Sequence, residues 1–278
     1  MTTTRFMKWW QRILIVTFVC VGALAFLVPL WWAIVWATWH TGEIFQFPPK
    51  FLPGPYLIDN LVRLQDRLGI WRAFGNSVYT TVVAMVGSLV FCSIAGFAFA
   101  KYRFKLRELL FFVLLATMAV PGQITAIPLF IMMIRLGWVD TYTGVIIPGL
   151  VPAFGVFMLR MSAQEAVPDE MLEAARMDGA NELTIFGRIA LPNLLPSMAA
   201  LSIFMFSGSW GSLFWPLIVL RSTEMFTLPV ALSSIMGAYE QPYDLLMAGS
   251  LLGIVPPLVL FLSNQRFFMK SLVAGAFK

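Results

Sequence analysis

Long apolar runs alternate with short polar segments along almost the whole chain. Six runs are long and apolar enough to be membrane helices; they cover residues 13–37, 78–100, 109–134, 143–159, 194–220 and 245–262. The first run follows Arg5, Lys8 and Arg12, as the apolar part of a signal peptide would. It is longer than the ~7–15 residues of such a peptide, so we expect an uncleaved transmembrane helix.

The predicted fold class is therefore all-α: a polytopic membrane protein with six transmembrane helices. Of its 278 residues, 59% are hydrophobic and only 12% are charged, against roughly 45–50% and 25% in soluble domains. We predict one transmembrane domain over residues 1–278. Its expected parts are a start at 1–12, a first span at 13–37, an outer loop at 38–77, spans two to four within 78–163, a polar loop at 164–192, spans five and six within 193–265, and a tail at 266–278.

The basic residues indicate the orientation. Six spans place both termini on the same side, and 19 residues are Lys or Arg. Thirteen of them lie on the side of the termini, since only six lie on the opposite side. Those six are Lys50, Arg63, Arg67, Arg72, Arg135 and Arg221. Because cytoplasmic loops carry the excess of Lys and Arg, we expect both termini and the polar loop at 164–192 in the cytoplasm, with the chain in an inner or plasma membrane.

The apolar runs contain no ionisable residue between their ends. Membrane transporters driven by ion gradients use such residues, so their absence argues against that class. No lysine follows a glycine, which excludes an ATP-binding GxxxxGK[ST] loop, and His40, Cys20 and Cys92 form no catalytic or metal-binding pattern. We therefore predict no enzyme activity, no metal, no cofactor bound by this chain and no nucleic-acid partner.

The third, fourth and fifth runs are interrupted by Pro, Gly, Ser and Thr. Such residues allow helices to kink and to pack closely, or they line a polar path. Helix packing explains them without any ligand. The alternative is a solute pathway that suits a sugar, since an aromatic ring stacks on a sugar ring and hydroxyl groups need hydrogen-bond partners. The candidate pathway residues are Gln123, Thr125, Ser207, Ser209 and Trp210.

The polar loop at 164–192 predicts two short helices. Residues 168–178 form the first, with Pro168 in its first turn and Gly179 as a left-handed cap. Asn181 caps the second, which has Leu183, Phe186 and Ala190 on one side, and we expect the next helix to resume after Pro192. An amphipathic hairpin on the lipid surface is one interpretation, but the loop is rich in acidic residues, so docking to a protein is favoured.

The same loop carries a specific motif. Glu173, Ala174 and Ala175, then Gly179, Ile189, and the pair Leu191 and Pro192 have the spacing of the EAA loop, and the sequence resembles permease subunits of binding-protein-dependent ABC importers. The resemblance implies that the loop forms coupling helices seated on an ATPase subunit. The implied docking residues are Glu173, Ala174, Ala175, Met177, Asp178, Gly179, Ile189, Leu191 and Pro192.

Other segments resemble carbohydrate permeases, in particular the smaller permease of maltose-type importers. They include PGQITAIPLF from Pro121 and SWGSLFWPLIVL from Ser209. The resemblance implies half of an alternating-access pathway for a sugar. Its implied partners are a second, different permease, an external solute-binding protein, membrane lipid and two ATPase subunits that hold ATP and Mg²⁺. A permease for a phosphorylated polyol such as glycerol phosphate is the alternative, followed by an ATPase-independent channel or a scaffold.

Overall fold

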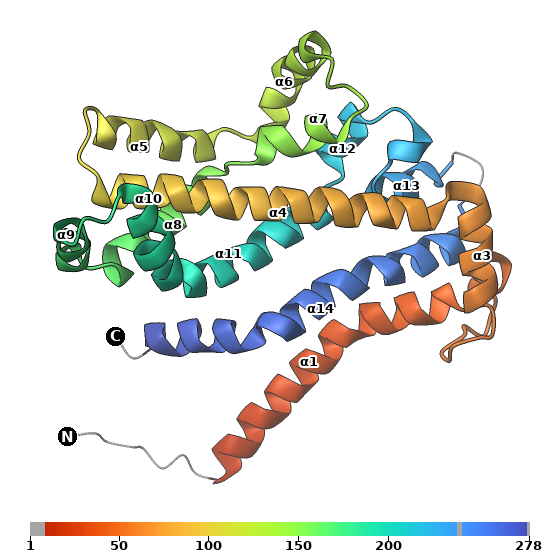
Figure 1. Cartoon of the computed structure of the whole chain (residues 1–278). Coiled ribbons are helices and arrows are strands. Elements are labelled where there is room, and N and C mark those ends of the chain that lie inside the picture. Colours follow the sequence, from red (N-terminus) through yellow and green to blue (C-terminus); the bar gives the residue numbers. More distant parts are fainter. Residues whose placement is uncertain (1–8, 238–240, 277–278) are drawn as a thin grey trace. The chain divides into compact units, whose positions relative to one another are not determined.

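The computed structural model describes residues 9–237 and 241–276, with side chains as far as Ser263. These residues form helices and turns and no β-strand, which confirms the all-α class (Figure 1). The longer helices are α1 (Trp9–Ala37), α3 (Leu57–Leu68), α4 (Ile70–Lys101), α5 (Arg107–Ala116), α6 (Gly122–Leu136), α8 (Ala153–Ala166), α9 (Asp169–Met177), α11 (Leu191–Trp210) and α14 (Tyr243–Ala276). Shorter ones are α2 (Thr41–Ile44), α7 (Tyr142–Ile146), α10 (Glu182–Ile185), α12 (Phe214–Val219) and α13 (Leu228–Ser234).

The helices belong to two compact units. The first combines the chain up to Arg67 with residues 235–252. Its centre is polar: the buried carboxylate of Asp244 lies 2.9 Å from Arg63 of α3 and accepts a 2.6 Å hydrogen bond from Thr41. Nearby, the amide of Asn60 donates to the carbonyls of Ala37 and Trp39. These contacts fix the loop after α1 against α3 and the start of α14.

The second unit, residues 68–234 and 253 onward, is organised around α4. This helix packs against α8 and α11, as Figure 1 shows for α11 along its length. Its approach to α8 is close because Gly96 has no side chain: a Cβ at this position would lie 2.8 Å from the backbone nitrogen of Arg160. Membrane helices commonly use small residues in this way. Cys92 and Leu201 are buried beside the same contact.

Among the described residues, four helical segments are long and apolar enough to cross a membrane: Trp9–Ala37, Ile70–Lys101, Glu182–Val219 and Tyr243–Ser263. Two further candidates are bent pairs. The segment Arg107–Ala119 meets α6 at 105°, and Tyr142–Gly149 meets α8 at 45°. Pro121 and Pro152 directly precede the second helix of each pair, where a missing backbone donor permits the break. Counting each pair once gives six, so the six-span topology stays a prediction.

Two apolar runs end differently from the expected helices. The run at 143–159 was expected to end before Arg160, but α8 continues to Ala166 and buries that residue. The Arg160 guanidinium lies 3.7 Å from the centre of the Phe111 ring and 3.4 Å from the Glu108 carboxylate, contacts that stabilise the buried charge. The run at 194–220 is two helices, because α11 ends at Trp210 and α12 starts only at Phe214.

Candidate functional site

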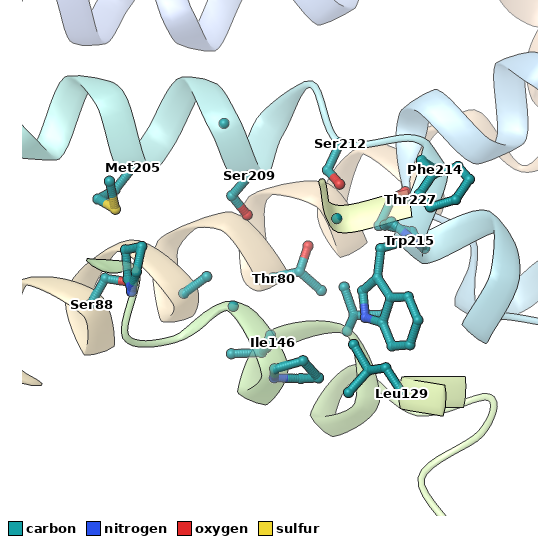
Figure 2. A pocket seen from close by; sticks show the side chains of 18 of the residues that line it. Thr80, Ser88, Leu129, Ile146, Met205, Ser209, Ser212, Phe214, Trp215 and Thr227 are labelled. Atoms are coloured by element: carbon teal, nitrogen blue, oxygen red, sulfur yellow. The ribbon is translucent and has the colours of Figure 1, made fainter. Parts of the chain in front are cut away.

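The second unit contains a cavity of about 530 Å³ between α4, α6, α11, α12 and the segment around α7 (Figure 2). Its walls are mostly apolar, with hydroxyl groups, one side-chain amide and one indole among them. The lining residues are Thr80, Ala84, Ser88, Gly122, Gln123, Thr125, Ala126, Leu129, Val145, Ile146, Pro148, Gly149, Pro152, Phe204, Met205, Gly208, Ser209, Ser212, Phe214, Trp215, Pro216 and Thr227. None of them is ionisable, so the cavity offers hydrogen bonds and apolar contact but no ion pair.

Several polar groups face this cavity. Figure 2 shows the side chains of Ser209 and Ser212 extending from the α11 side towards the space beside Thr80 of α4. Trp215 lies at one end, and its indole N–H donates to the Gly144 carbonyl at 2.9 Å, which fixes the plane of the ring. Thr227 is 5% exposed, and its hydroxyl has no hydrogen-bond partner among the described residues.

The structure brings three of the five predicted pathway residues to the cavity, namely Gln123, Thr125 and Ser209. Ser207 and Trp210 do not line it. Trp210 is buried, donates to the Gly253 carbonyl at 2.8 Å and stacks on Phe206, so its ring is used in packing.

Three aromatic residues line the cavity, namely Phe204, Phe214 and Trp215. Trp215 is the tryptophan among them and lies in the same SWGSLFWP segment of the sequence as Trp210. The sequence prediction missed it, because the break between α11 and α12 is not evident from the apolar pattern.

The polar loop folds into a helical pair, α9 and α10, that we call the knob (residues 168–192). As the sequence predicts, α9 begins after Pro168, and Gly179 follows it with a φ of 81°. The side chain of Asn181 caps α10 by accepting from the backbone N–H of Thr184 at 2.8 Å. The positive φ at Gly179 is a conformation that a side chain would strain, so glycine is required there.

The expected break near Pro192 is wrong. After α10 the chain passes through a π-helical turn, η3 (Phe186–Ala190), and continues directly into α11. Pro192 follows this turn directly, as the second residue of α11. Within α10, Ile185 is buried, whereas Leu183 is 83% exposed.

The predicted docking residues fall into two groups. Ala175 and Ile189 pack against a buried cluster that contains Leu172, Ile185 and Ala190, and Leu191 is also partly buried. The remaining docking residues are exposed: Glu173, Ala174, Met177, Asp178, Gly179 and Pro192. Met177 is 88% exposed, which is unusual for a large apolar side chain on a polar helix.

Ionic contacts join the knob to the end of α4. Lys101 Nζ lies 2.7 Å from the Asp169 carboxylate, and this contact lowers the pKa of Asp169. Tyr102 donates to Glu182 at 2.5 Å, and Glu182 also accepts from Arg176 at 3.0 Å. Burial, together with the hydrogen bond to Glu182, raises the pKa of Tyr102 to about 12. The knob is therefore held to α4, the helix that carries Thr80 and Ser88 to the cavity.

Comparisons with known proteins all indicate the same protein family. Residues 88–270 match the model of the binding-protein-dependent transport system inner membrane component. The chain is 42% identical to the arabinooligosaccharides transport system permease protein AraQ of Halalkalibacterium halodurans, over 82% of each chain. It is 33% identical to the lactose transport system permease protein LacG of Rhizobium radiobacter, over 91% of this chain and 92% of that one.

A solved structure agrees with these relatives. A bacterial ABC transporter involved in the import of the acidic polysaccharide alginate contains a chain with a TM-score of 0.82 and 25% identity. The match covers 95% of this chain and 100% of that one. The helical fold of this chain thus also occurs in a solved ABC transporter. The protein belongs to the family of binding-protein-dependent transport system inner membrane components, the membrane-embedded permease subunits of ABC importers.

Proposed function

We propose that this permease forms one half of an alternating-access pathway through which an ATP-driven importer takes up a neutral oligosaccharide. The observation that carries this proposal is the uncharged cavity, which combines hydroxyl groups, the Gln123 amide and the Trp215 ring. Sugars offer many hydroxyl groups for hydrogen bonds and apolar ring faces for stacking, so such a surface suits them. The names of the arabinooligosaccharide and lactose relatives support the same class of solute.

A phosphorylated polyol is the second candidate, because a sn-glycerol-3-phosphate transport permease, UgpE of Yersinia pestis, is 31% identical over 91% of this chain. A phosphate group is bound best by Arg, Lys or backbone N–H groups at a helix N-terminus. The cavity has no Arg, Lys or His among its lining residues, so the backbone N–H groups at the start of α6, where Gly122 and Gln123 line the wall, would have to bind a phosphate without a cationic side chain. The neutral sugar therefore fits this cavity better than the phosphate does.

The proposed importer contains a second, different permease, an external solute-binding protein and two cytoplasmic ATPase subunits that hold ATP and Mg²⁺. Both termini and the knob face the cytoplasm in this arrangement. Met177 and Leu183 expose two large apolar side chains on a rigid helical pair, beside the small exposed residue Ala174. Such a surface suits insertion into a cleft of the ATPase. ATP-driven closure of the ATPase pair would then move the knob and, through it, α4 and α11.

The test is ATP-dependent uptake by the complete importer in proteoliposomes. The double variant Met177→Glu with Leu183→Glu places charge on the proposed docking surface, so we expect the permease to reach the membrane while uptake falls at least tenfold. The matched control is Met171→Glu, an exposed methionine six residues earlier on α9 and therefore about 120° away around the helix. The control should keep most of the uptake. Normal uptake in the double variant would refute docking through this surface, and uptake without ATP would indicate a channel.

A further inference from the structure

We propose that the cavity is a binding subsite for one neutral sugar ring, with Trp215 as its stacking surface and Thr227 as a hydrogen-bonding group that finds its partner in the sugar. This inference rests on the proposed oligosaccharide transport and goes beyond it. It assigns solute recognition to this permease itself, at named residues that the EAA motif and the family comparisons do not identify.

Thr227 carries the inference because its hydroxyl is buried and unpaired. Its Oγ1 has no hydrogen-bond partner among the described residues, although the residue is only 5% exposed and lines the cavity. Buried hydroxyl groups are nearly always hydrogen-bonded, and an unpaired one therefore needs an explanation. The oxygen itself is closed off from the cavity, so a sugar hydroxyl supplies the missing partner only after the Thr227 side chain rotates towards the cavity about χ1. The unpaired group then favours the bound solute over an empty or apolar-filled cavity.

Trp215 provides the second element. The 2.9 Å hydrogen bond from its indole N–H to the Gly144 carbonyl fixes the ring, and Gly144 is itself held close against Trp138 and Val219. A ring that is already oriented loses little conformational freedom when it binds. Its polar edge is also satisfied within the protein, which leaves the apolar face for the C–H groups of a sugar ring.

The rest of the cavity matches in size and polarity. A cavity of about 530 Å³ falls in the usual range for small-molecule sites, roughly 300–1,000 Å³. Ser209, Ser212 and Gln123 add donors and acceptors on the other walls. Because no lining residue is ionisable, a carboxylate or phosphate would lose its hydration here without gaining a counter-charge. The subsite should therefore select neutral sugars over uronic acids and sugar phosphates.

The structure supplies a matched pair of variants to test this subsite. Thr81 is also buried with an unpaired hydroxyl, yet it does not line the cavity. Thr227→Val and Thr81→Val each replace an unpaired hydroxyl by a methyl group of nearly the same size. Neither should destabilise the fold, since removal of an unpaired buried hydroxyl is close to neutral. Any difference between the two variants then reports on the cavity.

The measurement is equilibrium binding of labelled arabinotriose to the purified importer without its binding protein. We expect Thr227→Val to weaken binding about tenfold, Thr81→Val to leave it unchanged, and Trp215→Leu to abolish it. A uronic acid trisaccharide of the same length should not compete. Equal affinity in both threonine variants, or full competition by the acidic sugar, would overturn the subsite. If the wild-type importer does not bind arabinotriose but still takes it up with ATP, the subsite alone is rejected. If the wild-type importer takes up no neutral oligosaccharide at all, the proposed function is rejected as well.

Discussion

The contact between α4 and α8 makes a specific prediction about Gly96. A Cβ built at this position lies 2.8 Å from the backbone nitrogen of Arg160 and 2.9 Å from the carbonyl carbon and Cβ of Leu159, whereas ordinary contacts begin at 3.4 Å. Gly96→Ala therefore requires α8 to move by 0.6 Å, the difference between 3.4 and 2.8 Å. The neighbouring atoms belong mainly to the backbone of a helix, so rotation of a side chain does not relieve the clash.

The expected magnitude follows from two opposing terms. Overpacking of a tight interface costs about 1–3 kcal/mol, and the backbone clash places this site towards the upper end. Alanine gains about 1 kcal/mol over glycine within a helix. The net destabilisation is about 1–2 kcal/mol, which lowers the melting temperature by roughly 2–8 °C in a chain of this size.

The assay is thermal unfolding of the purified protein in detergent, and the quantity measured is the fraction of protein that stays monodisperse at each temperature. The control is Gly75→Ala on the same helix, because a Cβ there meets nothing within 4 Å. Gly75→Ala should match or exceed the wild type through its better helix propensity. Equal or higher melting temperature for Gly96→Ala would refute the close approach of α4 and α8.

Four further perturbations test other contacts. Lys101→Glu should reduce ATP-driven uptake several-fold in an uptake assay, and adding Asp169→Lys should partly restore it; recovery would be absent if the knob did not depend on this pair. Because the contact with Lys101 lowers the pKa of Asp169, the ion pair stabilises the knob fully above the normal carboxyl pKa of about 3.9. The difference in stability between the wild type and Asp169→Asn should therefore shrink as pH falls below about 4 and vanish once pH is below the lowered pKa. In the first unit, Arg63→Met leaves the buried Asp244 charge without its ion pair and should lower the stability by about 2 kcal/mol in a melting assay. The loss is smaller than for a fully buried pair, because Arg63 is partly exposed. An unchanged melting temperature would contradict the importance of this pair. Asp140 has a φ of 59°, and its side chain accepts hydrogen bonds from the backbone N–H groups of Arg221 and Ser222. In the same assay, Asp140→Ala should lower the stability by about 2 kcal/mol, and Asp140→Asn by less than about 1 kcal/mol. Equal effects of the two variants would show that the side-chain oxygen of Asp140 is unimportant as an acceptor.

Local sequence signals predicted the helix ends correctly where residues close in the sequence determine the backbone conformation. Pro168, Gly179 and Asn181 mark the ends of α9 and α10, because fixed φ, permitted positive φ and side-chain capping act within a few residues. The apolar runs likewise located α1 and α4, although the structure extends both helices by several residues. The all-α class followed from the same runs.

Features that depend on contacts between distant segments could not be predicted from the pattern of apolar and polar residues. The π-helical turn at residues 186–190 joins α10 to α11 without a break, and no residue type in that stretch predicts it. Arg160 is buried because Phe111 and Glu108 lie on a helix far earlier in the chain. At the cavity, the sequence identified Gln123, Thr125 and Ser209 by composition. Whether a tryptophan packs inward or lines a cavity depends on tertiary structure.

The most direct test of the account is native mass spectrometry of the complex isolated from membranes through an N-terminal tag. We expect the intact mass of one copy of this chain with one different permease and two ATPase subunits. In the variant Met177→Glu with Leu183→Glu, the ATPase subunits should be lost while the second permease remains. The account would be contradicted if the chain were isolated alone or only with copies of itself, or if the variant retained both ATPase subunits.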